Sequence, residues 1–385
     1  MRDHSAQPDD HCLPGGAAAR LFFVLLLVLL LSGVPAITLS SSGPPAGNER
    51  AGEPVRIILL IADGAGAAQW TSALLSAGSL HTAALPVGGM ADTRADPQIV
   101  TDSAAAATAL ACGIMTCNGA IGMDGEGRPA ETVLERAEAR GMATGLVATS
   151  SLTHATPAAF AAHRPRRGML QEIAEDMARQ PMEVMLGGGR GHFDGSRRRD
   201  GRDLLSEYGW REGTVVTDPL LFETLDLDGV ERLAGLFAAD HLPSISEGRR
   251  PSLAAMTAAA LEVLDADPDG FFLMVEGSQP DWRCHDRRPL EEVAAEMLDF
   301  DGAVGAALAY QAERPGTLIV VTADHETAGL SLHPDGREGM EARYGSGAHT
   351  PSLVPLFAGG PGAGAFGGLK PLWRIGRLLL EAVDR

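Results

Sequence analysis

Lysine is almost absent from this chain, and the acidic residues greatly outnumber the basic ones. Lys370 is the only lysine, and 31 lysine and arginine residues stand against 50 aspartate and glutamate residues, for a formal net charge of −19. This balance argues against nucleic acid as a specific partner, because binding to a phosphate backbone requires a basic surface. An anionic substrate must instead be captured by local positive charge, such as that of a metal ion.

Cysteine is scarce as well, with four residues in a chain of 385. Their number and spacing fit neither a disulfide scaffold nor a zinc site of the C-x-x-C type. Cys112 and Cys117 lie five residues apart and can pair if they are oxidised, whereas Cys284 is isolated. The cysteines therefore say little about the redox compartment, and the pairing stays open at this point.

The N-terminal region contains an uninterrupted apolar run, Leu21 to Leu31, which is followed by small residues. A run of about 7–15 apolar residues of this kind predicts a signal peptide, here over residues 1–36 with cleavage near Ala36. The alternative is an uncleaved membrane anchor over residues 21–39. In either case we expect a periplasmic or extracellular protein, with the Ser/Gly/Pro-rich residues 37–54 as a flexible linker.

Residues 55–385 are predicted to form one large α/β domain. Short buried runs of apolar residues alternate with stretches of helical periodicity, which is typical of a mostly parallel sheet covered by helices. The predicted strands are 55–61, 143–149, 183–186, 271–275 and 317–321, and the predicted helices are 131–140, 168–179, 253–265 and 290–312. Residues 190–250 are richer in arginine, glycine and aspartate and are expected to form surface excursions.

A further helix is predicted where Asp102 and Ser103 precede a run of alanines that ends at Gly113. Aspartate or serine fits the N-cap, the alanines favour a helix, and glycine ends it. At a helix N-terminus, unpaired N–H groups and the helix dipole favour negative charge, which suits an alkoxide or a phosphate ester. The alternative is an ordinary cap on an alanine-rich core helix, and this stretch alone does not decide between the two.

Polar side chains follow the predicted strands, where sites gather in open α/β sheets. The candidates from these exits and from the later Ser346–Thr350 stretch are Asp63, His154, Thr156, Glu276, Asp281, His285, Asp324, His325 and His349. Asp281 and His285 have the i, i+4 spacing that places two side chains on one face of a helical turn. Carboxylate and imidazole ligands without thiolates suit zinc with open positions, and an all-oxygen set suits magnesium.

Three motifs make the chain resemble the alkaline phosphatase family, from about residue 55 to about residue 363. The stretch Thr101-Asp102-Ser103-Ala104-Ala105-Ala106-Ala107-Thr108-Ala109 is very close to the nucleophile signature of that family. Residues 271–279 (FFLMVEGSQ) and 321–327 (VTADHET) match two further motifs in the expected order. The resemblance implies a three-layer α/β/α sandwich with a large, mostly parallel central sheet, and hydrolysis of phosphate monoesters through a phosphoserine intermediate.

The resemblance also implies two zinc ions and one magnesium ion. The implied ligands are Asp281, His285 and His349 for the first zinc, Asp63, Asp324 and His325 for the second, and Asp63, Thr156 and Glu276 for the magnesium. Ser103 is implied as the nucleophile, bound to the second zinc when it is deprotonated.

The resemblance further assigns phosphate binding to Arg167, with Arg164 and Arg166 as nearby competitors. Arginine suits this task because its planar guanidinium binds two phosphate oxygens at once. Three more residues stand at positions that would support or tune the magnesium site and the affinity for phosphate: Asp102, His154 and Trp282.

Parts of the chain depart from the family pattern. Pro280, Cys284 and the run 286–288 look unusual beside the first zinc ligands. Only 23 residues lie between His325 and His349, so the large inserted crown of some family members is absent or much reduced, and a homodimer stays open. The remaining histidines are expected to be structural or superficial: His163, His192, His241 and His333.

Three related functions are weighed against a phosphomonoesterase. A phosphodiesterase of the same superfamily would share most ligands, but it usually has threonine as nucleophile and lacks the magnesium set. A sulfatase needs a Cys/Ser-x-Pro-x-Arg context, whereas alanines follow Ser103. An inactive phosphate- or metal-binding homologue is the third alternative, and the presence of every implied ligand argues against it.

Overall fold

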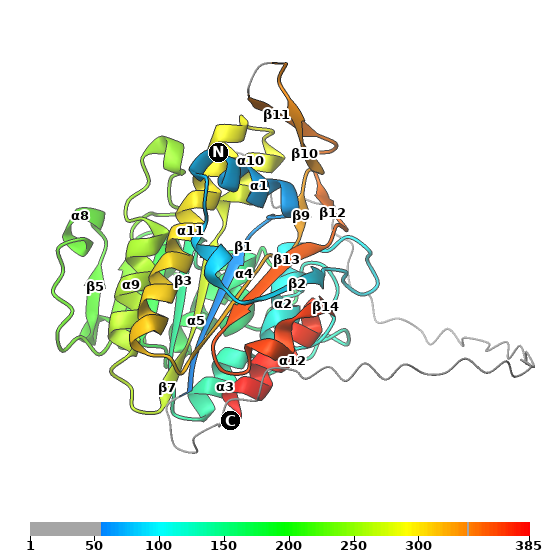
Figure 1. Ribbon diagram of the computed structural model, residues 1–385. Helices are drawn as coiled ribbons and strands as arrows, with labels where there is room; N and C mark the ends of the chain where they lie inside the picture. Colours follow the sequence, from blue (N-terminus) through cyan, green and yellow to red (C-terminus); the bar gives the residue numbers. More distant parts are fainter. Residues whose placement is uncertain (1–54, 337–338) are drawn as a thin grey trace, which may run out of the picture.

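The protein, described here by a computed structural model for residues 55–336 and 339–385, is built on a ten-stranded sheet between two layers of helices (Figure 1). This confirms the three-layer α/β/α arrangement that the sequence predicted. The predicted signal segment, residues 1–36, and the predicted linker, residues 37–54, lie outside the described residues. Within the described ranges, no helix combines the length and the apolar character that crossing a membrane requires.

The central sheet is mostly parallel. Its strands, in spatial order, are β14 (Gly368–Pro371), β2 (Val87–Asp92), β13 (Val354–Gly359), β8 (Thr317–Thr322), β1 (Val55–Ala62), β7 (Gly270–Gly277), β3 (Ala143–Ser151), β4 (Val184–Gly188), β6 (Leu233–Leu236) and β5 (Thr214–Val216). Only β13 among them runs antiparallel to its neighbours, β2 and β8. The apolar side chains of β1 from Ile57 to Ile61 are buried, because helices cover both faces of the sheet.

The helices divide between the two faces of the sheet (Figure 1). One layer contains α1 (Ala67–Ala77), α9 (Leu253–Leu264) and α11 (Leu290–Glu313), and the other contains α2 (Ser103–Cys112), α3 (Val133–Ala139), α4 (Ala155–Ala161), α5 (Leu170–Arg179) and α12 (Leu372–Val383). Every residue of α2 is buried, which explains its many alanines. A Cβ atom added at Gly376 of α12 would lie 2.3 Å from the Ala109 carbonyl oxygen, so small residues are needed where α2 and α12 meet.

The predicted strands and helices all form within a few residues of their predicted ends. The prediction for residues 190–250 was partly wrong, because this region contributes β5 and β6 to the sheet as well as the short helices α6 (Arg190–Phe193), α7 (Leu204–Glu207) and α8 (Pro219–Phe222). Both strands are shorter than five residues, and such runs show little of the alternation by which strands are recognised. Between His325 and His349 the chain forms a small hairpin of β10 (Leu330–Pro334) and β11 (Met340–Tyr344).

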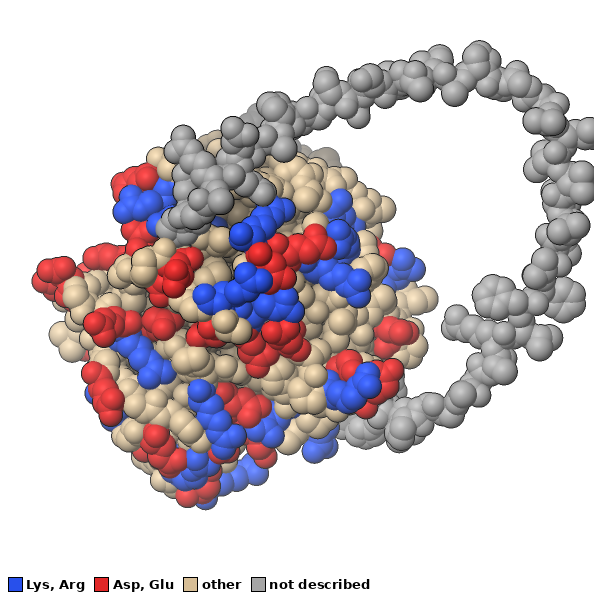
Figure 2. Space-filling view, turned by 90° about the horizontal axis from the view of Figure 1, so that it is seen from below, with Lys and Arg blue, Asp and Glu red and all other residues tan. Residues whose placement is uncertain are grey.

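Two further sequence expectations concern thiols and charge. Cys112 is a free cysteine whose thiol donates to the Ala130 carbonyl oxygen, so it does not pair with Cys117. On the face seen from below, basic side chains lie among acidic ones (Figure 2). The net negative charge therefore does not appear on this face as a field of one sign.

Candidate active site

The candidate ligands come together at the carboxyl ends of four adjacent strands, β3, β7, β1 and β8. Asp63 follows β1, Glu276 lies near the end of β7, and Asp324 follows β8. Parallel strands end at the same edge of a sheet, so side chains more than 200 residues apart in sequence meet there. Asp63, Asp324 and His325 lie close enough to hold one ion, and all three are fully buried.

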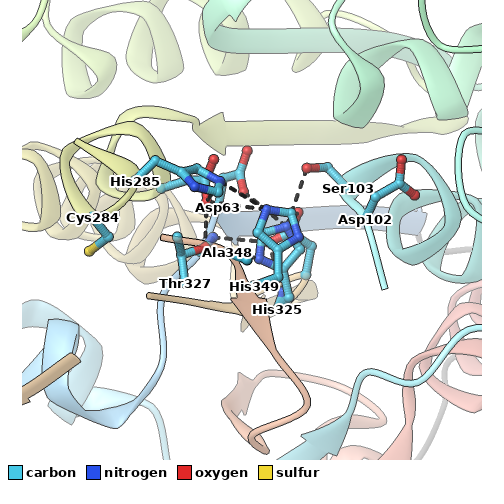
Figure 3. Close-up of polar contacts among 12 residues, drawn as sticks. Asp63, Asp102, Ser103, Cys284, His285, His325, Thr327, Ala348 and His349 are labelled. Carbon is cyan, nitrogen blue, oxygen red and sulfur yellow. Dashed lines mark hydrogen bonds and ion pairs between the residues drawn. The ribbon is translucent and has the colours of Figure 1, made fainter. Parts of the chain in front are cut away.

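Ser103 begins α2 and points toward this cluster (Figure 3). Its Oγ lies 3.3 Å from His325 Nε2, and the residue is 2% exposed. The Asp102 carboxylate is the N-cap and accepts a hydrogen bond from the Ala105 N–H group at 2.9 Å. Capping and the position of the hydroxyl are therefore separate roles: Asp102 caps the helix, and Ser103 faces the cluster.

A second group surrounds Asp281, which lies on α10 (Gln279–His285). His285 Nε2 lies 3.3 Å from Asp281 Oδ1, and His349 Nε2 lies 3.6 Å from the same oxygen. The two imidazole Nε2 atoms are 3.1 Å apart. His325 is also near this group, because its ring stacks on that of His349 with centroids 3.5 Å apart. The i, i+4 pair predicted from the sequence thus lies on one turn of a helix, with His349 beside it.

The other ring nitrogens of these histidines face groups of a different kind. His285 Nδ1 lies 2.8 Å from the Gly347 carbonyl oxygen, and His349 Nδ1 lies 2.9 Å from the Thr101 carbonyl oxygen. A carbonyl oxygen only accepts, so Nδ1 carries the proton in both rings. Nε2 is then the atom with a lone pair, which is how an outer contact prepares a histidine to bind a metal.

A third group contains Asp63, Glu276 and His154, whose ligand atoms lie within 4.8 Å of one another. The sequence prediction had Thr156 in this set and gave His154 a tuning role. The Thr156 hydroxyl is buried and also faces Glu276, where it lowers the pKa of the carboxyl against the dominant effect of burial. Besides the oxygen donors Asp63, Glu276 and Thr156, the His154 imidazole is thus close enough to act as a ligand in the third group.

Several buried oxygens of the cluster lack a hydrogen-bond partner among the described residues. Both oxygens of Asp63 are in this state, together with Asp324 Oδ2 and Glu276 Oε1. The remaining oxygens are held: Asp324 Oδ1 accepts from the Gly64 N–H group, and Glu276 Oε2 accepts from the Ser278 hydroxyl. Buried polar atoms are normally paired, so these open oxygens indicate a site for a cation.

Burial and mutual repulsion dominate the electrostatics of the cluster. Burial raises the pKa of Asp63 well above its usual range, and repulsion from neighbouring carboxylates adds to the effect. Burial likewise raises the pKa of Asp324 to about 7 and raises that of Glu276. Burial lowers the pKa of His325 well below its usual value, so this imidazole is neutral and available as a ligand.

Arg167 reaches the cluster from the side of Ser103. Its Nη1 donates to Asp102 Oδ2 at 3.1 Å, and its Nη2 lies 3.1 Å from His154 Nε2. Arg164 instead pairs with Asp176, and Arg166 is exposed. Of the three arginines considered from the sequence, the structure brings Arg167 to the Ser103 side of the site.

Two residues near the cluster were not among the predicted site residues. The His241 ring packs edge-on against Trp282 at 4.5 Å and against His154 at 5.6 Å between centroids, although a structural or superficial role was expected. Thr327 contacts both Asp281 and His325 through its hydroxyl. Thr327 ends the motif 321–327, which was the local signal for it, whereas no sequence signal links His241 to the motifs.

Comparison with known proteins is consistent across sequence and structure. The alkaline phosphatase family model matches residues 56–363. Alkaline phosphatases 3 and 4 of Bacillus subtilis (strain 168) are 44% and 39% identical over 251 residues, which cover 63% of this chain and 52% and 53% of the relatives. The chain thus spans about half the length of these curated relatives.

A solved structure covers more of the chain. The alkaline phosphatase from the Antarctic bacterium TAB5 superposes with a TM-score of 0.81 at 35% sequence identity, covering 86% of this chain and 98% of that one. A variant of the TAB5 protein, with a TM-score of 0.80 and the same identity and coverage, contains magnesium bound in its M3 site.

Proposed function

This chain belongs to the alkaline phosphatase family, and we propose that it is a metal-dependent hydrolase of phosphate monoesters that works through a phosphoserine on Ser103. One observation carries the proposal: buried carboxylate oxygens that have no hydrogen-bond partner among the described residues face the same space as the Ser103 hydroxyl at the start of α2. A hydroxyl at a helix N-terminus beside cation ligands suits a nucleophile that attacks an anionic ester.

The donor sets fit two zinc ions and one magnesium ion. Asp281, His285 and His349 would hold one zinc, Asp63, Asp324 and His325 the other, and Asp63, Thr156 and Glu276 the magnesium. When bound, such ions supply positive charge that favours the ionised hydroxyl and offsets the charge of the phosphate. Mixed carboxylate and imidazole donors suit zinc. The oxygen donors Asp63, Thr156 and Glu276 suit magnesium, with the His154 imidazole beside Asp63 and Glu276.

Ser103 provides the covalent step. Its Oγ would lose its proton and form a bond to phosphorus as the bond to the leaving oxygen breaks. The leaving alkoxide would take up one proton, so that the step consumes none overall. Water would then attack phosphorus, release inorganic phosphate and restore the Ser103 hydroxyl. Two in-line displacements retain the configuration at phosphorus overall.

Arg167 binds and orients the phosphate. Its guanidinium can donate two parallel hydrogen bonds to the equatorial oxygens. Asp102 accepts from Nη1, and His154 lies at Nη2, so both neighbours restrict the orientation of the guanidinium. These oxygens remain negatively charged in the transition state. A positioned cation therefore stabilises the transition state as well as the bound substrate.

The function is tested by steady-state hydrolysis of an aryl phosphate monoester and the matching diester, with and without a chelator. We expect turnover of the monoester that is lost on chelation and restored by zinc plus magnesium. Equal or better turnover of the diester would overturn the assignment in favour of a phosphodiesterase. Absence of turnover of both esters by the fully metal-loaded protein would favour the inactive homologue.

Metal content and export are tested separately. Elemental analysis of the purified protein should give two zinc ions and one magnesium ion per chain, whereas zinc in all three positions would contradict the magnesium assignment. We also propose that the protein is exported, which rests on the apolar run from Leu21 to Leu31. N-terminal sequencing of the mature protein should show cleavage near Ala36, and an intact N-terminus would favour the anchor.

A further inference from the structure

The Thr327 side chain lies near the histidines His285, His325 and His349 of the cluster that Ser103 faces (Figure 3). The residue is fully buried at the end of β9 (Glu326–Thr327). Its Oγ1 donates to Asp281 Oδ1, which belongs to the first proposed zinc set. The same Oγ1 lies 3.3 Å from Nδ1 of His325, which belongs to the second set. One hydroxyl therefore contacts a ligand of each set.

The chemistry of the three groups fixes the direction of both hydrogen bonds. A carboxylate only accepts, so the single hydroxyl proton of Thr327 is donated to Asp281. The lone pairs of the hydroxyl are then left to accept the N–H group of His325 Nδ1. This places the lone pair of the His325 ring on Nε2, which lies 3.2 Å from Asp324 Oδ2 and 3.3 Å from Ser103 Oγ. The Thr327 hydroxyl thereby sets the tautomer of His325 and holds Asp281 at the same time.

The backbone of Thr327 is held independently of any ion. Its N–H group donates to the Gly64 carbonyl oxygen at 3.1 Å, and its carbonyl oxygen accepts from the Gln69 amide at 3.1 Å. Thr327 also pairs across an antiparallel bridge with His349 of β12 (His349–Thr350). Gly64 has a φ of 73°, and a Cβ atom there would lie 2.8 Å from Thr327 Oγ1. The hydroxyl is therefore fixed by packing and by main-chain hydrogen bonds.

We propose that Thr327 is a positioning residue that couples the two zinc sets, an inference that rests on the proposed function. Outer contacts to metal ligands restrict the orientation of the ligands and typically contribute 10–100-fold to metal affinity. Because Thr327 contacts a ligand of each set, removing its hydroxyl weakens both sets. We therefore expect the wild-type protein to release both ions in one phase and a protein without this hydroxyl to release them in two.

The test compares Thr327→Val, which replaces the hydroxyl with a methyl group of similar size, with Thr327→Ser, which keeps the hydroxyl. Zinc affinity is measured on purified full-length protein by competition with a chromophoric chelator, and the time course of zinc release to the chelator is followed. We expect about 10–100-fold weaker binding and two release phases for the valine variant. For the serine variant we expect binding within about threefold of wild type and a single phase.

Thr257→Val is the matched control, because Thr257 is also buried and its hydroxyl donates within α9 to the Leu253 carbonyl oxygen at 2.8 Å. It should leave zinc affinity unchanged. Thermal unfolding of each metal-free variant establishes that it folds. If the valine variant does not fold, Thr327→Ala, which removes the hydroxyl and reduces volume, takes its place in the comparison.

Each outcome bears on one proposal. Zinc affinity in Thr327→Val equal to wild type would overturn the role of Thr327 and leave the proposed function intact. Equal weakening in Thr327→Ser and Thr327→Val would also overturn it, because retaining the hydroxyl would then not preserve zinc binding. A wild-type protein that binds no zinc would contradict the metal assignment of the proposed function itself.

Discussion

Two buried acidic clusters in this molecule differ in what neutralises them. In the first, the Arg249 guanidinium, whose side chain is 1% exposed, pairs with Glu296 and Asp299. In the second, the carboxylates of Asp63 and Asp324 face each other in the sheet-edge cluster without a described arginine or lysine between them. The first cluster includes its own cation, whereas the second presents open oxygens to the space beside Ser103.

The comparison distinguishes acidic side chains that are buried together with a cation of the protein from acidic side chains that are buried where a bound cation is needed. Burial raises the pKa of Glu296 and of Asp299 even though Arg249 counteracts it, so an internal cation only partly offsets desolvation. Burial raises the pKa of Asp63 further above its usual range, and nearby carboxylates add repulsion. A cluster that is this unfavourable without a cation is expected where a metal ion is part of the working protein.

The largest effect is expected when the proposed nucleophile, which lies beside the unpaired oxygens of the second cluster, is removed. Ser103→Ala should lower the rate of aryl phosphate hydrolysis by about 10⁴-fold or more, as loss of a covalent nucleophile usually does. Stability should change little, because the one side-chain hydrogen bond of Ser103 Oγ among the described residues is to the His325 ring. Steady-state kinetics and trapping of labelled phosphate at mildly acid pH measure both points.

Ser72→Ala is the control for this substitution, since the Ser72 hydroxyl is buried in α1 and donates to the Gln69 carbonyl oxygen at 2.7 Å. It should keep nearly full activity. A phosphate label that survives Ser103→Ala would refute Ser103 as the nucleophile.

Removing Arg249 from the first cluster should lower the free energy of unfolding and leave the catalytic chemistry unchanged. Arg249→Met leaves two buried carboxylates without their partner, which typically costs about 3–5 kcal/mol. Urea unfolding measures this loss, and zinc should still stabilise the variant because the ligands at the other cluster are intact. Arg250→Met is the matched control, since its ion pair with Glu223 is exposed and should contribute at most about 1 kcal/mol. Equal losses for both variants would contradict the comparison.

Arg167 supplies a third, intermediate test. Arg167→Ala should lower kcat/KM by about 10²–10³-fold, because a cation aimed at the phosphate is lost from the open cluster. Inhibition by inorganic phosphate should weaken in parallel. Arg164→Ala is the control, since Arg164 is paired with Asp176 and turned away. A larger effect of Arg164→Ala than of Arg167→Ala would transfer the phosphate-binding role.

The smallest expected effect is a pH dependence at a half-buried pair outside both clusters. Burial tends to lower the pKa of His163, but its hydrogen bond to Glu135, with nearby Asp176, raises it above the usual value. Burial tends to raise the pKa of Glu135, but His163 lowers it overall. The pair therefore stabilises the fold between the ordinary pKa values of glutamate and histidine, about 4.3 and 6.5.

His163→Gln tests this effect on metal-free protein by urea unfolding at about pH 6 and pH 8.5. The free energy of unfolding of the wild type should fall by up to about 1 kcal/mol as the pH rises through the raised pKa of His163, and that of the variant should fall by less. An equal pH dependence in both proteins would contradict the role of the pair.

The local patterns in the sequence were sufficient for the strands β1, β3, β4, β7 and β8 and for the helices α2, α3, α5, α9 and α11, whereas the other elements were not predicted from it. The apolar run before Asp63 favours a strand and the alanines after Ser103 favour a helix. Both preferences belong to the segments themselves, so β1 and α2 form where they were predicted. The strand at Leu233–Leu236 was missed because four residues carry too little periodicity, and its pairing with β4 and β5 makes it a strand.

The site was predictable only as far as its motifs extend. Asp324 and His325 follow a strand in a recognisable motif, and the structure brings them to Asp63. His241 reaches Trp282 only because the loop after β6 crosses to α10, which no local pattern encodes. The approach of His154 to Asp63 and Glu276 likewise depends on which strands are neighbours in the sheet.

The sequence by itself determined the long, strongly patterned strands and helices, the motif residues and the family, because propensity, periodicity and motif spacing are properties of short segments. Only the tertiary structure decided which side chains meet. It turned Arg167 toward Asp102 and Arg164 toward Asp176, and it placed the Thr327 hydroxyl between Asp281 and His325. These contacts depend on strand order and burial, which are settled only when segments distant in sequence pack together.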